Sequence, residues 1–92
     1  MRIAVDNQVG YDAIFYLESK GHEVVLKAGN EPDNIWFIDA LDAGAELFIS
    51  PDWDIAFLCN KHDVKFIQLC QNVRGEKIGK FVINKINQRS FD

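Results

Sequence analysis

The stretch ELFISPDWD, residues 46 to 54, changes from apolar to acidic within a few positions. Its first part, residues 47–49, is typical of a short buried strand. The pair Ser50-Pro51 is an ordinary helix opening, with serine as the cap and proline at the first helical position. We therefore expect a strand that gives way directly to a helix, with Asp52 and Asp54 at the junction.

The same alternation of strands and helices continues on both sides of this junction. Glycine and proline mark most of the boundaries, because glycine favours helix ends and turns and proline is tolerated in a first helical turn. The predicted strands are residues 2–5, 22–28, 46–50 and 64–69, and the predicted helices are residues 11–20, 32–43 and 52–60.

The C-terminal segment allows two interpretations. Ile78, Phe81, Val82 and Ile86 lie at helical spacing, whereas residues 80–84 also fit the edge of a sheet. We expect a helix, with the edge strand as the alternative.

Strands that alternate with helices of about ten residues are typical of βαβ units, which build a parallel sheet with helices on both faces. The chain has 92 residues, of which 48% are hydrophobic, and this is enough for one core but too little for two. We expect a single domain over residues 1–92. Its fold class is α/β: a small three-layer α/β/α domain with a mostly parallel, four-stranded sheet.

Carboxylates recur where strands end or where the following helices begin: Asp6, Asp33, Asp52 and Asp54. In a parallel sheet all these junctions lie at one edge, so we expect the side chains to converge. If the strand order is 2-1-3-4, Asp6 and Asp52 flank the point where the direction of winding reverses, which is where such sheets bind ligands. Taken singly, Asp33 and Asp54 also fit the role of first-turn acids that the helix dipole favours.

Clustered carboxylates repel one another unless a cation neutralises them. Ligands that are all oxygen suit Mg²⁺ or Mn²⁺, and a metal held in this way can activate a water molecule in phosphodiester hydrolysis. The sequence therefore predicts a metal-dependent nuclease. Asp6 and Asp52 are the expected main ligands, Asp33 a ligand or the residue that orients the attacking water, and Asp54 a supporting or second-metal group.

Several segments resemble the short PIN-like proteins of prokaryotes and their phages. The resemblance covers roughly residues 1 to 58, and its motifs are the start IAVDNQ, the strand GHEVV, the helix that begins near Asp33, and the junction ISPDWD. PIN domains are typically ribonucleases that depend on Mg²⁺ or Mn²⁺, and many are the toxins of toxin–antitoxin pairs. The resemblance thus implies a PIN-like fold, single-stranded RNA as substrate and an antitoxin as a protein partner.

The PIN pattern maps onto this chain residue by residue. Asp6 matches the first acid, Asp33 the acid that opens a middle helix, and Asp52 with Asp54 the final pair. The chain departs from the pattern where Ser50 replaces threonine and where Trp53 and Ile55 replace a polar residue and phenylalanine; for the acid of an early helix, Asp12 is the nearest candidate. A catalytically inactive PIN-like module that binds a protein or a nucleic acid is therefore the alternative function.

The net charge of −4 conceals an asymmetry along the chain. Residues 1–60 hold eleven acidic and three basic side chains, whereas residues 61–92 hold three acidic and seven basic ones. A basic run of this kind is either a solvated helix face or a contact for a polyanion or an acidic partner. The residues predicted to contact nucleic acid are Arg74, Lys77, Lys80, Lys85 and Arg89.

Three other groups of side chains are expected to have packing, surface or subunit-contact roles. Cys59, His62 and Cys70 match no strong zinc signature, so we expect reduced, partly buried cysteines instead of a metal site. We expect His22 and His62 at the sheet edge opposite the acids, as surface or packing residues. The aromatic side chains of the second and third helices are expected to make core or subunit contacts: Trp36, Phe37, Trp53 and Phe57.

No stretch of the sequence approaches the roughly 20 apolar residues that cross a bilayer, and the N-terminus does not resemble a signal peptide. We expect a cytoplasmic protein without a membrane contact. A homodimer is a further expectation, because a domain this small gains buried core by association.

Overall fold

The computed structural model describes residues 1–70 and 73–92, and strands and helices alternate along them. The strands are β1 (Arg2–Val5), β2 (Glu23–Lys27), β3 (Leu47–Ser50) and β4 (Lys65–Gln68), and the helices are α1 (Tyr11–Ser19), α2 (Asp33–Asp42), α3 (Trp53–Lys61) and α4 (Glu76–Asn87). The helix expected in the C-terminal segment is confirmed, and the edge-strand alternative is wrong.

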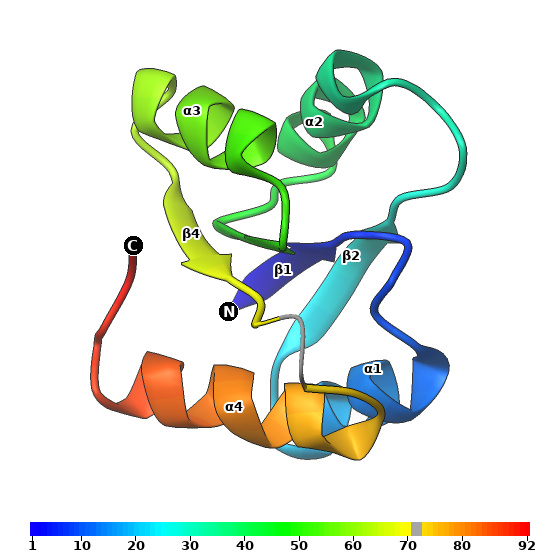
Figure 1. Ribbon diagram of the computed structural model, residues 1–92, viewed down its shortest axis with the longest axis vertical. Helices are drawn as coiled ribbons and strands as arrows, with labels where there is room; N and C mark the ends of the chain where they lie inside the picture. The colour runs from blue at the N-terminus through cyan, green and yellow to red at the C-terminus, as the bar shows by residue number, and fades with distance from the viewer. Residues whose placement is uncertain (71–72) are drawn as a thin grey trace.

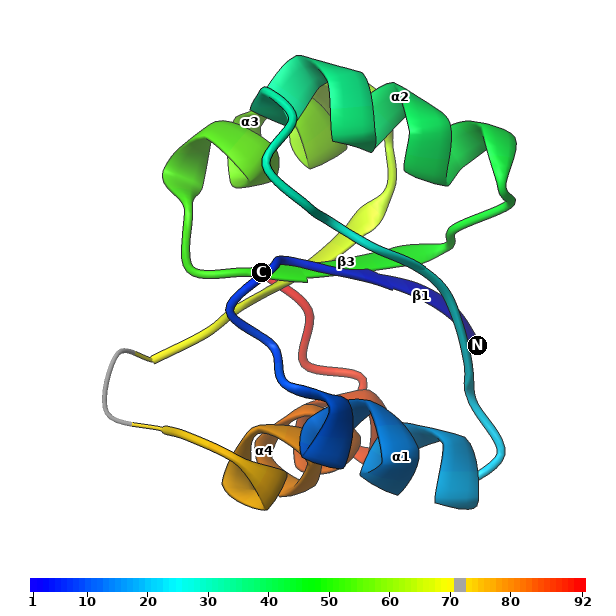
Figure 2. The same cartoon turned by 90° about the vertical axis from the view of Figure 1, so that its right-hand side faces the viewer.

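The strands form one parallel sheet in the order β2-β1-β3-β4. Helices α2 and α3 cover one face of this sheet, and α1 and α4 cover the other (Figure 1; Figure 2). The predicted three-layer α/β/α fold is confirmed. Because the chain winds outward from the centre of the sheet in both directions, the winding reverses between β1 and β3, as the order 2-1-3-4 requires.

Each face of the sheet has its own hydrophobic core, because successive side chains of a strand point to opposite faces. Ile3 and Val5 pack with Leu17 of α1 on one face. Ala4, between them in the chain, packs with Phe37 of α2 on the other face. Because both faces of the sheet are buried, the strand sequences are continuously apolar and do not alternate between apolar and polar residues.

A close contact holds α4 against α1. Gly79 lies inside α4, where a Cβ atom would come within 2.7 Å of Cδ1 of Tyr16. A glycine inside a helix normally destabilises it by about 0.5–1 kcal/mol relative to alanine. Here the missing side chain lets the Tyr16 ring approach the α4 backbone, and α4 consequently lies across the sheet beside α1.

The outer edge of β4 is covered by the C-terminal residues. The backbone N–H of Asp92 donates to the carbonyl oxygen of Phe66 at 2.8 Å, and Oδ2 of Asp92 accepts from the N–H of Gln68 at 2.7 Å. These bonds occupy backbone groups that an edge strand would otherwise leave open for pairing with another chain.

Two local expectations are wrong. Ser50 is not the cap of α3: it is the last residue of β3, and Asp52 is the N-cap, with Trp53 as the first helical residue. For Trp53 and Phe57 the expected core contact is wrong, since they are 67% and 68% exposed, whereas the expected subunit contact stays a prediction. Trp36 and Phe37 do lie in the core, as expected.

None of the helices within the described residues is both long enough and apolar enough to cross a membrane.

Candidate metal centre

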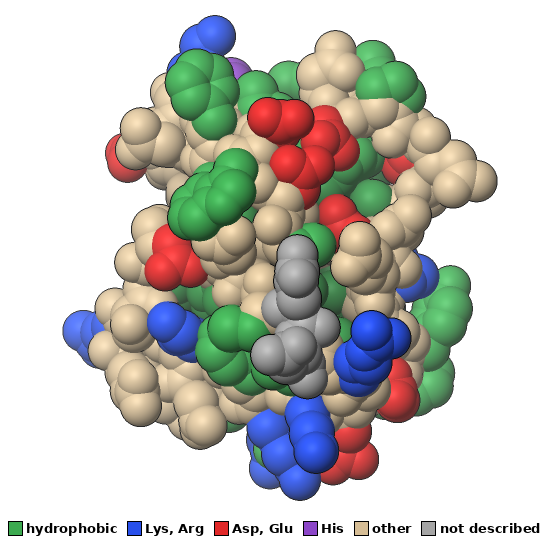
Figure 3. Space-filling model, in the orientation of Figure 1, with side chains coloured by type: hydrophobic (Ala, Val, Ile, Leu, Met, Phe, Trp, Pro, Cys, Tyr) green, Lys and Arg blue, Asp and Glu red, His purple; other side chains and the backbone are tan. Residues whose placement is uncertain are grey.

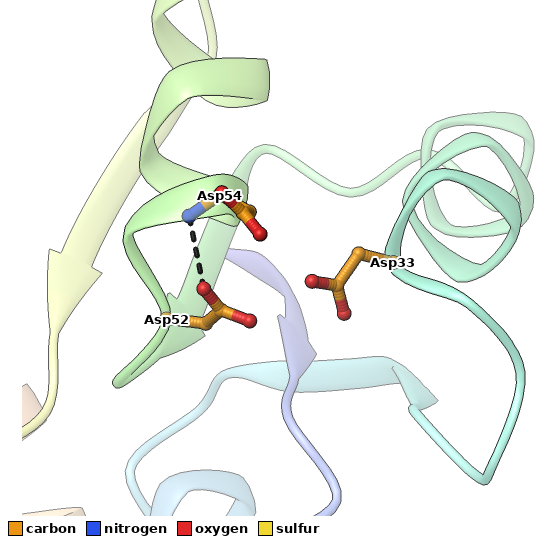
Figure 4. A group of neighbouring side chains, drawn as sticks. All are labelled: Asp33, Asp52 and Asp54. Atoms are coloured by element: carbon orange, nitrogen blue, oxygen red, sulfur yellow. Dashed lines mark hydrogen bonds between the residues drawn. The ribbon is translucent and has the colours of Figure 1, made fainter.

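Three of the four predicted carboxylates come together at the carboxyl edge of the sheet. Asp33 is the first residue of α2, Asp52 is the N-cap of α3, and Asp54 lies in the first turn of α3. One carboxylate oxygen of each lies within 4.8 Å of those of the other two. Figure 4 shows Asp33 facing the other pair from the neighbouring helix, so the group joins two successive helices of the chain. We call Asp33, Asp52 and Asp54 the acidic group.

The position of Asp52 follows from hydrogen bonds at the start of α3. Its Oδ1 accepts from the backbone N–H of Asp54 at 3.0 Å, which is an ordinary capping bond. Its own backbone N–H donates to Oγ of Ser50 at 3.0 Å. Capping therefore explains why an acid stands at position 52, but it does not explain why Asp33 of another helix faces it.

Asp6 lies next to the acidic group but is not one of its members. The hydroxyl of Ser50 donates to Oδ2 of Asp6 at 3.1 Å, and the backbone N–H of Gln8 donates to Oδ1 of Asp6 at 3.0 Å. Both oxygens of Asp6 thus already accept hydrogen bonds. Ser50, which is fully buried, links Asp6 to the backbone of Asp52.

Burial and the neighbouring acids perturb Asp33. Partial burial raises the pKa of its carboxyl above the ordinary value of 3.8, and the side-chain contact with Asp52 raises it further. The negative charges of Asp52 and Asp54 act in the same direction, whereas a hydrogen bond from Trp36 Nε1, at 3.2 Å, opposes the rise in the pKa. Asp33 therefore takes up a proton more readily than an isolated aspartate, and a nearby cation would reverse this tendency.

Basic side chains do not neutralise the acidic group. Among residues 1–70 and 73–92 the ion pairs are Arg2 with Glu23 and Lys80 with Glu76. Neither involves a member of the acidic group. Figure 3 shows red side chains gathered between α2 and α3, with blue side chains mostly on the α1 and α4 half of the molecule.

The five predicted nucleic-acid contacts do not form one patch. Arg74 lines a hollow of about 470 Å³ together with Gln8 and Pro51, which follow β1 and β3 at the carboxyl edge. Arg89 instead lines a hollow with Met1 and Lys65, at the amino ends of β1 and β4. Between these ends, Lys77 is exposed, Lys80 pairs with Glu76, and Lys85 lies over the ring of Phe81. Of the five, Arg74 is the one beside the carboxyl edge.

The remaining candidate residues lie apart from the acidic group. Asp12 is in the first turn of α1, where its Oδ1 accepts from the N–H of Ala13. Cys59 is buried, and burial raises the pKa of its thiol to about 12, which does not favour a metal-binding thiolate. Cys70 is exposed, so the expectation of partial burial is wrong for it, and His62 lies beside the ring of Phe37.

The exposure of Trp53 and Phe57 on α3 differs from the expected core contact. Ile55 and Cys59 of α3 are buried and stand four residues apart, which defines the inner face of the helix. Trp53 and Phe57 have the same spacing but are offset by two residues, or roughly 200° around the helix. The offset alone would have placed these rings on the outer face.

Comparisons with protein-family models, with curated proteins and with solved structures find no match for this chain. Membership of the PIN-like proteins therefore stays a prediction that depends on the motifs themselves.

Proposed function

We propose that this protein is a nuclease that hydrolyses phosphodiester bonds with a divalent cation, Mg²⁺ or Mn²⁺, held by the acidic group. The observation that carries the proposal is that Asp33, Asp52 and Asp54 each offer an oxygen within 4.8 Å of the others. These residues come from two helices, so helix capping does not account for their meeting.

The donor set fits a hard divalent cation. All the ligand atoms are carboxylate oxygens, which Mg²⁺ and Mn²⁺ prefer over nitrogen and sulfur ligands. Three carboxylates leave room for water and for phosphate oxygens, as Mg²⁺ sites in phosphoryl-transfer enzymes generally do. A cation bound here would lower the pKa of a bound water and stabilise the leaving oxygen.

The protein side chains then have separate tasks. Asp52 is held in place by its capping bond to Asp54 and by Ser50, so it is the most rigidly positioned ligand. Asp33 faces the other two carboxylates from the neighbouring helix, so it would complete the ligand set or orient the attacking water. Asp6 acts as a positioning residue, because its Oδ2 accepts from the Ser50 hydroxyl, which in turn accepts from the backbone N–H of Asp52.

The proposed substrate is single-stranded RNA, as the resemblance to PIN-like proteins implies. A phosphate backbone at this acidic edge needs positive charge nearby, which the cation and Arg74 would supply. We therefore restrict the proposed nucleic-acid contact to Arg74, which precedes α4, and Lys77 in its first turn.

Two measurements test the proposal. Isothermal titration should detect Mn²⁺ binding to the wild type and a large loss of it in Asp52→Asn, since asparagine is an equally good helix cap but carries no charge. Wild-type protein with Mn²⁺ should cleave single-stranded RNA, and Asp52→Asn should not. Absence of Mn²⁺ binding at millimolar concentration would reject the proposal.

The alternative proposal is a non-catalytic module that binds a protein partner, such as an antitoxin. The observation in its favour is the number of large apolar side chains in solvent on the two helices next to the acidic group: Ile35, Ile38, Trp53 and Phe57. Metal binding without RNA cleavage, together with capture of a protein partner by this face, would favour it.

A further inference from the structure

Trp53 is an exposed residue in the first turn of α3, the same turn that holds Asp54 of the acidic group. Trp53 lies between Asp52 and Asp54 in the chain, and its side chain is 67% exposed. The backbone that positions two of the carboxylates therefore also positions this ring. Figure 3 shows large hydrophobic side chains in solvent over α3, beside the acidic side chains.

Trp53 also lines a groove of about 710 Å³ that runs between α3 and β4. Exposed aromatic rings, an amide, an ammonium group and two carboxylates contribute to its walls: Trp53, Phe57, Asn60, Lys65, Asp63 and Asp92. The volume lies in the ordinary range for small-ligand sites, roughly 300–1,000 Å³. Rings that offer a flat surface, next to amide, ammonium and carboxylate groups that can donate or accept hydrogen bonds, suit a planar heteroaromatic ring with polar edges.

We infer that this groove is a nucleobase subsite, in which an unpaired base of a single-stranded nucleic acid stacks on Trp53. The neighbouring phosphate then reaches the cation held by Asp33, Asp52 and Asp54. The inference rests on the proposed function for that cation, because without it the carboxylates would repel the phosphate. Stacking tolerates any base, so the subsite favours unpaired strands without selecting a sequence.

Charge argues against a second copy of this chain as the occupant. A symmetric dimer brings the same surface of both copies together. If Trp53 formed such a contact, the carboxylates of Asp52 and Asp54 from both copies would lie near the same interface. These like charges are unfavourable at an interface, and a nucleic acid also supplies a phosphate ligand to the bound cation, which a second copy does not.

The test measures binding of a fluorescently labelled oligouridylate of about ten nucleotides by anisotropy, with saturating Mg²⁺ and within a time too short for cleavage. Trp53→Leu should weaken binding roughly tenfold or more, whereas Trp53→Tyr, which keeps a ring, should stay within about threefold of the wild type. The matched control is Phe15→Leu, because Phe15 is 64% exposed but lies on α1 on the other face of the sheet. Its affinity should equal that of the wild type.

Two further readouts separate this inference from the proposed function. Titration of Mg²⁺ without oligonucleotide should give equal affinities for the wild type and Trp53→Leu. Equal oligonucleotide affinities for the wild type and Trp53→Leu would overturn the nucleobase subsite but not the proposed metal centre. Failure of the wild type to bind Mg²⁺ would overturn both proposals. If Trp53→Leu no longer self-associates but binds the oligonucleotide as tightly as the wild type, Trp53 makes a dimer contact. This result would also overturn the subsite.

Discussion

The indole Nε1 of Trp36 donates a hydrogen bond of 3.2 Å to Oδ1 of Asp33. Trp36 is only 1% exposed, and its ring packs beside that of Phe48, with 5.7 Å between the centroids. One carboxylate of the acidic group is thus tied directly to the hydrophobic core. A change in the charge on Asp33 changes the surroundings of a buried indole.

Trp36 should therefore report metal binding. The chain contains two tryptophans, so Trp53→Phe leaves Trp36 as the single source of tryptophan emission. Adding Mg²⁺ to this variant should change the emission in a saturable way, because the cation draws charge from the carboxylate that accepts the indole hydrogen bond. Adding Asp33→Ala should abolish the change, whereas adding Asp39→Asn, an exposed acid further along α2, should preserve it. An unchanged response in the Asp33→Ala background would contradict the prediction.

The raised pKa of Asp33 predicts how stability depends on pH without metal. The folded state disfavours ionised Asp33, so this carboxyl lowers the free energy of unfolding once the pH rises through its folded pKa, which lies above 3.8. Below the unfolded pKa both states are protonated and the effect disappears. Asp33→Asn, which can still accept from Trp36, should therefore have a higher melting temperature than the wild type at neutral pH in EDTA.

Thermal melts at several pH values check this prediction. The advantage of Asp33→Asn should shrink as the pH falls through the raised folded pKa toward 3.8 and be absent below 3.8, and at neutral pH saturating Mg²⁺ should stabilise the wild type more than the variant. Asp39→Asn, the matched control, should show neither trend. A variant that melts below the wild type at neutral pH without metal would show that the acids do not repel one another.

Removing the hydroxyl of Ser50 should have a large effect on the free energy of unfolding. It is fully buried and bridges Oδ2 of Asp6 to the N–H of Asp52. Ser50→Ala would leave these two groups without that partner, which should lower the free energy of unfolding by about 1–3 kcal/mol. Urea denaturation measures the loss, and Mg²⁺ affinity should fall with it because Asp52 is less well positioned.

The control for Ser50→Ala is Ser19→Ala. The hydroxyl of Ser19 donates to the carbonyl oxygen of Tyr16 at 2.6 Å, but Ser19 is exposed at the end of α1, where water can replace it. Its loss should change the free energy of unfolding by less than about 0.5 kcal/mol. Equal losses in the two variants would mean that the buried bridge has no special role.

The sequence predicted the fold because each boundary has a local cause. Short apolar runs are interrupted by glycine, proline or aspartate, and their alternation with helical stripes favours a parallel sheet. The convergence of Asp33, Asp52 and Asp54 also follows from this topology, since strand-to-helix junctions of parallel strands share one edge. No knowledge of side-chain contacts was needed for either step.

The details that the sequence did not predict depend on contacts between distant residues. Asp6 follows the correct strand but is not in the acidic group, and its oxygens accept hydrogen bonds from Ser50, 44 residues away, and from Gln8. The basic run was treated as one surface because its residues are close in sequence. Helix α4 has twelve residues, or about 18 Å, and carries the two ends of that run to opposite edges of the sheet.

Because the basic residues Arg74 and Arg89 lie at opposite edges of the sheet, reversing their charges should have different effects on RNA binding. Arg74 lines the hollow at the carboxyl edge, next to Gln8 and Pro51, whereas Arg89 lines the one at the amino ends of the strands. Arg74→Glu should therefore weaken binding to single-stranded RNA and flatten its dependence on salt by about one unit in the log–log slope.

Arg89→Glu changes the net charge by the same amount and is the matched control. It should leave the slope unchanged in anisotropy titrations with Mg²⁺, because its charge is far from the proposed path of the phosphates. Equal effects of the two reversals would mean that α4 attracts RNA through its overall charge, and an effect of Arg89→Glu alone would move the nucleic-acid contact to the opposite edge of the sheet.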